Sequence, residues 1–160
     1  MLIRSFEPRD RARLTQLTVE TFGPFYEESF RPLAGEVVFT RQHGRWREDY
    51  HALLATLHDP DHHRYVAVAD AGGVIAGYVG WEIDHSRGRG RIEILAVDAQ
   101  HRGRHLGTEL CEHAFGDMRA RGAVYVEIGT GGDEFHAPAR ALYESLGCVK
   151  VPAAVYFREL

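Results

Sequence analysis

Short runs in which apolar residues alternate with polar ones recur along the chain, and each run predicts a β-strand. An Ala-Gly-Gly turn at 71–73 separates two of these runs, so the strands on either side of it are expected to pair. The predicted strands cover residues 2–6, 64–70, 74–84, 91–97 and 123–128, and two further short strands at 149–151 and 155–158 close the sheet.

Apolar residues at helical spacing lie between the predicted strands. Pro8 opens the first predicted helix, and Pro60 follows the end of another at 46–58. Pro138 and Gly147 suit the first turn and the C-terminal cap of the last helix. A further helix carries the apolar stripe Leu106, Leu110, Ala114 and Met118. Interspersed strands and helices predict an α/β or α+β sandwich, and 160 residues suit a single domain over 1–160.

The segment 92–108 joins a predicted strand to a predicted helix through a short turn rich in Arg and Gly. A strand, a turn with exposed amides and a helix N-terminus form a ready site for phosphate, and Arg102 and Arg104 add fork-shaped positive donors. Gly103 and Gly107 are too close together for a Walker loop, and the turn does not fit a G-x-G-x-x-G fingerprint. The turn therefore predicts a different ligand that carries a pyrophosphate.

The same turn resembles the coenzyme A loop of the GCN5-related N-acetyltransferases, the GNAT family, written Q/R-x-x-G-x-G/A. Arg102 and Gly107 match its first and last positions. His105 stands where the middle glycine is expected. A histidine still offers its backbone N–H there, but it tolerates a positive φ poorly compared with glycine.

A second segment, 136–148, resembles the family's N-x-x-A-x-x-L-Y-E-x-x-G-F signature. His136 replaces the usual Asn, and Cys148 replaces the usual Phe. The matching residues are Ala139, Leu142, Tyr143, Glu144 and Gly147. Two signatures in the expected order identify the chain as similar to this family over about residues 65–150.

The resemblance implies a mixed, mostly antiparallel sheet, flanked by helices and splayed at the strand that ends near Val97. It also implies an N-acetyltransferase that uses acetyl-CoA as cosubstrate and no metal. His105 would contact the phosphates and His136 the pantetheine arm. The residues expected to bind coenzyme A are Leu95, Ala96, Val97, Arg102, Gly103, Arg104, His105, Leu106, Gly107, Thr108, His136, Ala139, Arg140 and Tyr143.

Two side chains are candidates for the chemistry. Glu93 is the candidate general base, because similar enzymes often use a carboxylate on this strand, and alternation places it on one face with Leu95 and Val97 unless a bulge intervenes. Tyr143 stands where the family places the acid that protonates the departing thiolate. The alternatives are a Glu93 that is solvated or paired with Arg91, and a Tyr143 that only packs in the core.

Composition narrows the function further. The net charge of −4 gives no global basic field for nucleic acid, and no apolar run is long enough to span a membrane. The N-terminus lacks a signal-peptide pattern, so the cytoplasm is the expected location. Cys111 and Cys148 are expected to be reduced core thiols, and the His-rich stretch 58–63 to be a solvated turn rather than a metal site.

Aromatic and acidic residues occur where the family forms its acceptor pocket. Such a surface suits a small cationic amine, for example an aminoglycoside-like antibiotic or a polyamine. The expected acceptor residues are Phe25, Tyr26, Glu27, Asp133 and Glu134, with Tyr78 and Trp81 adding to the wall. Two alternatives stay open: an enzyme that acetylates protein N-termini or lysines, and a non-catalytic acyl-CoA sensor. A homodimer is compatible with the sequence, but no residue fixes it.

Overall fold

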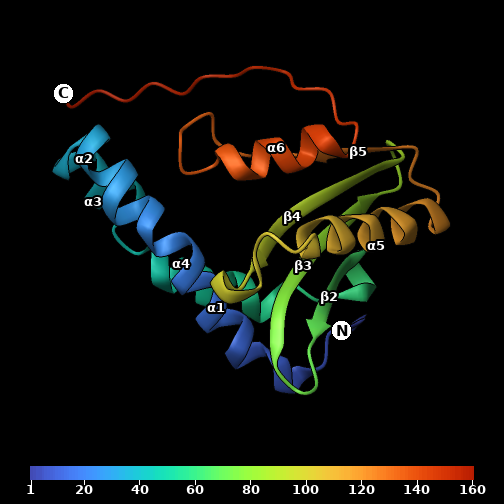
Figure 1. The fold of residues 1–160 in the computed structure, drawn as a ribbon. Coiled ribbons are helices and arrows are strands. Elements are labelled where there is room, and N and C mark those ends of the chain that lie inside the picture. The colour runs from blue at the N-terminus through green and yellow to red at the C-terminus, as the bar shows by residue number, and fades with distance from the viewer.

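A computed structural model describes all 160 residues. Its sheet has five strands in the order β1-β2-β3-β4-β5, antiparallel throughout except for the parallel pair β4 and β5 (Figure 1). The strands are β1 (Leu2–Ser5), β2 (Arg64–Asp70), β3 (Ile75–Asp84), β4 (Arg89–Val97) and β5 (Tyr125–Ile128). The mixed, mostly antiparallel sheet expected from the sequence is confirmed.

Helices cover both faces of this sheet. The α-helices of the chain are α1 (Arg11–Pro24), α2 (Arg31–Ala34), α3 (Glu36–His43), α4 (Trp46–Thr56), α5 (Leu106–Ala120) and α6 (Ala137–Ser145). The chain also forms the short 3-10 helices η1 (Pro8–Asp10), η3 (Pro60–His62) and η4 (Ala99–His101), and the π-helix η2 (Phe25–Phe30). None of these helices combines the length and the apolar character that crossing a membrane requires.

Two apolar clusters, one on each face, hold the layers together. Leu14 and Leu17 of α1 pack with Leu54 of α4 against one face, and Leu110 and Ala114 of α5 pack against the other. All five side chains are buried, and burial of each of the four leucines stabilises the fold by about 1.5–3 kcal/mol. Because both faces of β2 and β3 are covered, these strands are buried along nearly their whole length.

A β-bulge interrupts β4 at Glu93. Gly80 of β3 pairs with Ile94 but the next residue, Trp81, pairs with Ile92, which leaves Glu93 without a partner. Leu95 packs against the same α5 cluster as Ile92. In a regular strand these two residues, three positions apart, would face opposite sides of the sheet, so the bulge has shifted the alternation. The expectation that Glu93 shares a face with Leu95 and Val97 is wrong, because the bulge reverses the alternation.

The sheet splays beyond the same bulge. The parallel pairing of β4 with β5 ends at Ile92 and Ile128, so the outer edge of β4 from Glu93 to Val97 has no partner strand. A strand edge without a partner offers backbone N–H and C=O groups to a ligand. The splay predicted near Val97 is present, and it opens at Ile92.

The C-terminal residues lie outside the sheet. The strands predicted at 149–151 and 155–158 do not form, and residues 149–160 are exposed throughout. The last residue with a backbone–backbone hydrogen bond is Cys148, whose N–H donates to the Tyr143 carbonyl. The expectation that this segment closes the sheet is wrong, because the segment runs past α6 toward α2 instead of along β5 (Figure 1).

Candidate functional site

The turn before α5 presents backbone amides and basic side chains together. Gly103 and His105 both have positive φ, 72° and 62°, and His105 caps α5 without a side-chain hydrogen bond. The first amides of a helix have no partner within it, and the α5 ladder begins only where the Glu109 N–H donates to the His105 carbonyl at 3.0 Å. Leu106 is buried, whereas Gly107 and Thr108 are partly exposed.

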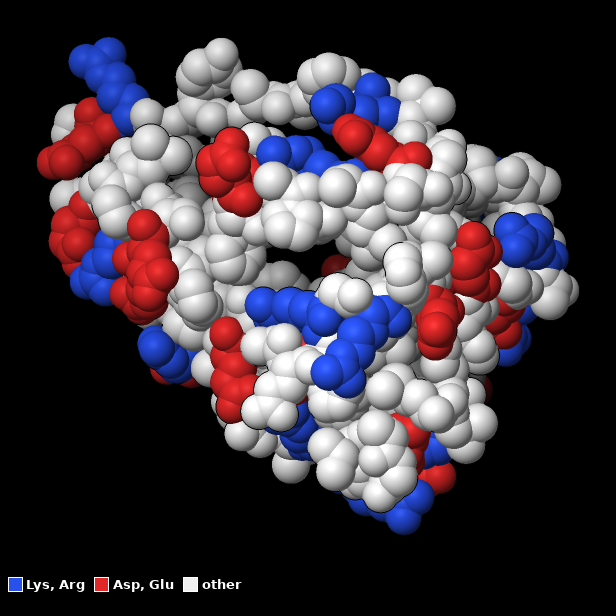
Figure 2. Space-filling view, viewed as in Figure 1, with Lys and Arg blue, Asp and Glu red and all other residues white.

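Basic residues surround those amides. Arg102 and Arg104 are exposed, and the Arg102 Nε donates to the Val97 carbonyl at 3.0 Å, which ties the turn to the end of β4. Figure 2 shows basic side chains gathered over this part of the molecule, beside an opening in the surface. The turn therefore keeps positive charge and unbonded donors next to the free edge of β4.

Helix α6 lies across from this turn. A Cβ on Gly107 would come within 3.1 Å of the Leu142 Cδ2, so glycine lets the two helices approach. Ala139 is partly exposed on α6. Arg140 is already engaged, because its Nη1 donates to the carbonyls of Gly131 and Asp133 at 2.6 Å each. Arg140 thus braces the loop between β5 and α6.

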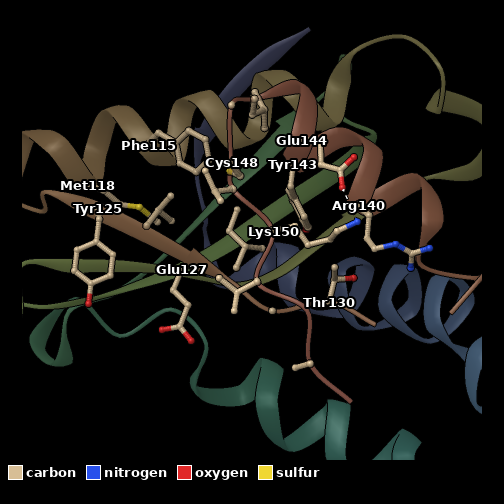
Figure 3. Close-up of a pocket in the computed structure, with 18 of the residues that line it drawn as sticks. Phe115, Met118, Tyr125, Glu127, Thr130, Arg140, Tyr143, Glu144, Cys148 and Lys150 are labelled. Carbon is tan, nitrogen blue, oxygen red and sulfur yellow. Dashed lines mark ion pairs between the residues drawn. The ribbon is translucent and has the colours of Figure 1, made fainter. Parts of the chain in front are cut away.

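Tyr143 of α6 lines a cleft of about 1140 Å³ (Figure 3). Burial, followed by the nearby thiols of Cys111 and Cys148, raises the pKa of this phenol, so it holds its proton at neutral pH. Burial likewise raises the pKa of Cys111 to about 12 and that of Cys148 above its ordinary value. Tyr143 is therefore a protonated donor, and neither thiol is activated as a nucleophile.

Glu93 lies on the face of the sheet opposite α5, beside the carboxylate of Glu82. Its side chain is 23% exposed, and its Oε1 is 3.9 Å from the Arg91 Nη1. Burial is the main cause that raises the pKa of Glu93, and the negative charge of Glu82 raises it further. Sequence analysis missed Glu82. The antiparallel register that pairs Glu82 with Arg91 was the signal that could have placed it near Glu93.

Phe25 joins the N-terminal helices to the loop before α6. Its ring lies 4.7 Å from that of His136 and 5.6 Å from that of Phe135. The His136 Nδ1 is 2.6 Å from the Asp133 Oδ1. Burial opposes ionisation of Asp133, but the hydrogen bond and charge of His136 lower its pKa overall. The structure therefore brings Phe25, Asp133 and His136 together, and Phe135 is an additional aromatic residue that sequence analysis missed.

The other predicted acceptor residues are arranged differently. Tyr26 stacks on Trp46 with ring centroids 5.2 Å apart. The Glu27 carboxylate accepts from Arg31 at 2.7 Å and from the Trp46 Nε1 at 3.2 Å, and the bond from Arg31 is the main cause that lowers its pKa. Its charge is thus largely neutralised within the protein. Glu134 is exposed and has no ion-pair partner.

Tyr78 and Trp81 do not line an acceptor pocket. Tyr78 is 0% exposed, and its hydroxyl forms a hydrogen bond with the Thr18 Oγ1. Trp81 is 4% exposed, and its Nε1 donates to Asp117 of α5 at 3.0 Å. That prediction is wrong because β3 lies in the middle of the sheet with helices on both faces. In the His-rich stretch, His62 pairs with Asp59 and the His58 Nδ1 accepts from the Val66 N–H at 3.0 Å. No group of three or more His, Cys, Asp or Glu side chains could hold a metal.

Comparisons with known proteins agree with this geometry. The model of the Acetyltransferase (GNAT) family matches residues 17–148. A GNAT-family acetyltransferase from Desulfovibrio desulfuricans is similar in structure, with a TM-score of 0.69, 20% identity, and 91% of this chain and 83% of that chain covered. No curated protein matches the sequence.

Two enzymes of known substrate share the fold. The aminoglycoside N-acetyltransferase AAC(6')-Iy in complex with CoA has a TM-score of 0.65 and 15% identity, with 99% of each chain covered. Glucosamine-6-phosphate N-acetyltransferase from Arabidopsis thaliana has a TM-score of 0.62 and 17% identity, with 98% of each chain covered. Identities this low support the fold and leave the substrate to be argued from the site.

Proposed function

The chain belongs to the acetyltransferase (GNAT) family, and on that premise we propose that it transfers an acetyl group from acetyl-CoA directly to the primary amine of a small cationic molecule. The observation that carries the proposal is the bulged Glu93, whose pKa is raised by burial and by Glu82 beside the open edge of β4. A carboxylate with a raised pKa is a better proton acceptor than an ordinary one.

The residues around the splayed edge fit coenzyme A. The amides at the start of α5 and the side chains of Arg102 and Arg104 would hold the pyrophosphate, since they combine unbonded N–H groups with positive charge. The free backbone of β4 at Leu95, Ala96 and Val97 would bind the pantetheine arm. One of its N–H groups would stabilise the charge that develops on the thioester oxygen.

Deprotonation of the acceptor is the step that needs Glu93. A lysine-like amine with a pKa near 10.4 costs about 4.6 kcal/mol to deprotonate at pH 7, whereas an α-amine with a pKa near 7.8 costs about 1 kcal/mol. Glu93 would take this proton, directly or through a water. The neutral amine then attacks the thioester carbonyl, the C–S bond breaks, and the nitrogen loses its second proton to solvent as the amide forms.

Tyr143 would return a proton to the leaving thiolate. A protonated phenol is needed for this role, and Tyr143 is protonated at neutral pH, although the burial that raises its pKa also makes it a weaker acid. Direct transfer is favoured over an acetyl-enzyme because the pKa values of Cys111 and Cys148 are raised, which leaves both thiols protonated.

The acceptor side favours a cationic amine with an apolar part. Glu93 and Glu82 share one ion-pair partner, Arg91, and Glu134 has none, so these carboxylates would attract a cationic amine. Phe25 and Phe135 offer aromatic surface. Glu27 and Asp133 add less charge than expected because they are paired. The shared fold with an aminoglycoside acetyltransferase is compatible with this substrate class.

The proposal is tested by following thiol release from acetyl-CoA across aminoglycosides, polyamines, lysine-containing peptides and peptides with free N-termini, with mass spectrometry of each product. We expect selective turnover of one class of small cationic amine. Turnover of peptides alone would mean that the acceptor is a protein N-terminus or a lysine side chain and not a small cationic molecule. Saturable acetyl-CoA binding without turnover of any amine would instead support the non-catalytic sensor.

A further inference from the structure

His136 packs against a residue of the expected acceptor pocket, although the resemblance to the family implies that it contacts the pantetheine arm. Its ring centroid is 4.7 Å from that of Phe25 and 5.0 Å from that of Phe135. The loop before α6 brings it there, because this loop reaches from β5 toward the N-terminal helices (Figure 1). Phe25 belongs to the π-helix η2, and π-helices are rare and occur frequently at functional sites.

The Asp133 carboxylate orients the His136 imidazole. Its Oδ1 is 2.6 Å from the His136 Nδ1, and the imidazole makes no other hydrogen bond. Burial opposes ionisation of Asp133, but the hydrogen bond and charge of His136 lower its pKa overall, so the carboxylate is ionised at neutral pH. An ionised carboxylate only accepts hydrogen bonds. The proton of a neutral imidazole therefore lies on Nδ1, and Nε2 is left as an acceptor.

The backbone around this pair is built to hold it. Arg140 donates to the carbonyls of Gly131 and Asp133 at 2.6 Å each, and it makes no bond to the Asp133 carboxylate. A Cβ on Gly131 would collide with that carboxylate and come within 2.7 Å of the His136 Nδ1, so glycine leaves room for the pair. The Asp133 Oδ2 has no hydrogen-bond partner in the protein. No guanidinium therefore cancels the charge of Asp133, whereas Arg31 bonds to Glu27.

The pair and the neighbouring rings together suit a cation. When the imidazole is neutral, the pair carries one negative charge, and its Nε2 can accept a hydrogen bond from an ammonium group. The side chains of Asp133 and His136 are 31% and 17% exposed, so a ligand can reach them. Phe25 and Phe135 are also partly exposed, and the faces of aromatic rings attract cations.

We propose that Phe25, Phe135 and the Asp133–His136 pair bind a second ammonium group of the acceptor, so that the substrate carries at least two amino groups. We call these four residues the second-ammonium site. The inference rests on the proposed function, because the reacting amine of the same molecule is placed at Glu93. His136 is then a specificity-determining residue that touches the acceptor, and Asp133 is a positioning residue that fixes the orientation of its ring.

Binding of amines to the protein saturated with coenzyme A tests the second-ammonium site without turnover, because coenzyme A carries no acetyl group. The probes are α,ω-diamines of increasing length, from propanediamine to dodecanediamine, each compared by calorimetry with the monoamine of the same length. We expect at least one diamine to bind about fivefold or more tightly than its monoamine, as a cation–π contact in a partly desolvated site would give. A series in which no diamine binds more tightly than its monoamine would overturn the site.

Two variants remove separate parts of the site. Asp133→Asn removes the charge and keeps the size of the side chain, and Phe25→Leu removes a ring without touching the loop before α6. Each should lower the preference for the diamine by about threefold or more and leave the affinity for the monoamine unchanged. A merely structural role would weaken the binding of both amines equally, and equal weakening in both variants would overturn the site.

The matched control is Asp59→Asn. The Asp59 Oδ2 is 2.7 Å from the His62 Nδ1, so this exposed pair has the same spacing along the chain and the same ring nitrogen as Asp133–His136. No aromatic ring packs against His62 in the manner of Phe25 and Phe135. The variant should keep the full preference for the diamine, and loss of that preference would overturn the assignment to Asp133.

His136→Asn separates the acceptor from the cofactor. We expect this variant to lose preference for the diamine and to keep the wild-type affinity for acetyl-CoA. A lower affinity for acetyl-CoA with an unchanged preference would overturn the second-ammonium site and place His136 on the pantetheine arm. Failure of the proposed function has a different signature, because a protein that turns over no amine can still show the preference in the complex with coenzyme A.

Discussion

Replacing Glu93 with Gln removes the proposed base and keeps the size of the side chain. The carboxylate is 23% exposed and sits at the unpaired position of the β4 bulge. An amide cannot accept the amine proton at neutral pH, so the acceptor must reach the site already neutral. The rate then depends on the small fraction of amine that is unprotonated in solution.

The expected loss of kcat/KM depends on the pKa of the acceptor amine. For a lysine-like amine the neutral fraction at pH 7 corresponds to a cost of about 4.6 kcal/mol, and general bases typically contribute about 10²–10⁴-fold. We therefore expect kcat/KM at pH 7 to fall by about 10²–10⁴-fold for such an amine. An α-amine, which costs only about 1 kcal/mol to deprotonate, should lose much less.

The pH dependence of kcat/KM shows whether Glu93 acts as the base. A base must be deprotonated to act, and burial and Glu82 raise the pKa of Glu93, so the acid limb of the wild-type profile should lie above the ordinary glutamate pKa of about 4.3. Glu82→Gln is the matched control: it removes one cause of the raised pKa and should move that limb to lower pH while the base remains. Glu93→Gln should abolish the limb, leaving a rate that rises toward alkaline pH.

The melting temperature of the same samples shows whether the Glu93→Gln variant is folded. A carboxyl whose pKa is raised by folding stabilises the folded state when protonated, and that contribution is lost as pH rises through the folded pKa. Glu93→Gln should therefore not lower the melting temperature at pH 7. A variant with wild-type kcat/KM and a profile parallel to the wild type would refute the reasoning, whatever the acceptor.

Three further variants test separate parts of the account. Tyr143→Phe should lower kcat by about 10²-fold or more with little change in acetyl-CoA affinity measured by calorimetry, and an unchanged kcat would remove the phenol from the mechanism. His105→Gly should raise the free energy of unfolding by about 1 kcal/mol, because the φ of 62° is strained for histidine; denaturant unfolding showing a loss would contradict that strain. Tyr78→Phe should cost about 1 kcal/mol of stability, since Thr18 keeps its bond to the Leu14 carbonyl, and a large rise in the KM for the amine would return Tyr78 to the acceptor site.

The sequence predicted the strands and helices of the central region well, because their apolar periodicity reflects packing that the structure contains. It also predicted the strain at His105, since only the turn chemistry was needed. The side on which Glu93 lies could not be predicted, because a single bulge reverses every later position on the strand. The pairing of Glu27 with Arg31 and Trp46 likewise depends on how η2 and α4 meet, which periodicity does not encode.

The predictions for Tyr78 and for the C-terminal segment were wrong for different reasons. An aromatic residue with a hydroxyl suits either a pocket wall or a buried hydrogen bond, and only the position of Thr18 decides in favour of burial. Residues 149–160 alternate as a strand does, but alternation alone supplies no partner strand, and these residues make no backbone–backbone hydrogen bond.

The most direct test of the central claim is thiol release from acetyl-CoA measured with and without an amine acceptor in one rapid-mixing experiment. Direct transfer predicts no burst of thiol without amine and steady, saturable release with it. Release of one equivalent of thiol per chain without amine would contradict direct transfer and point to an acetyl-enzyme. Absence of amine-dependent release, despite saturable binding of acetyl-CoA, would contradict the assignment of Glu93 and Tyr143 to catalysis.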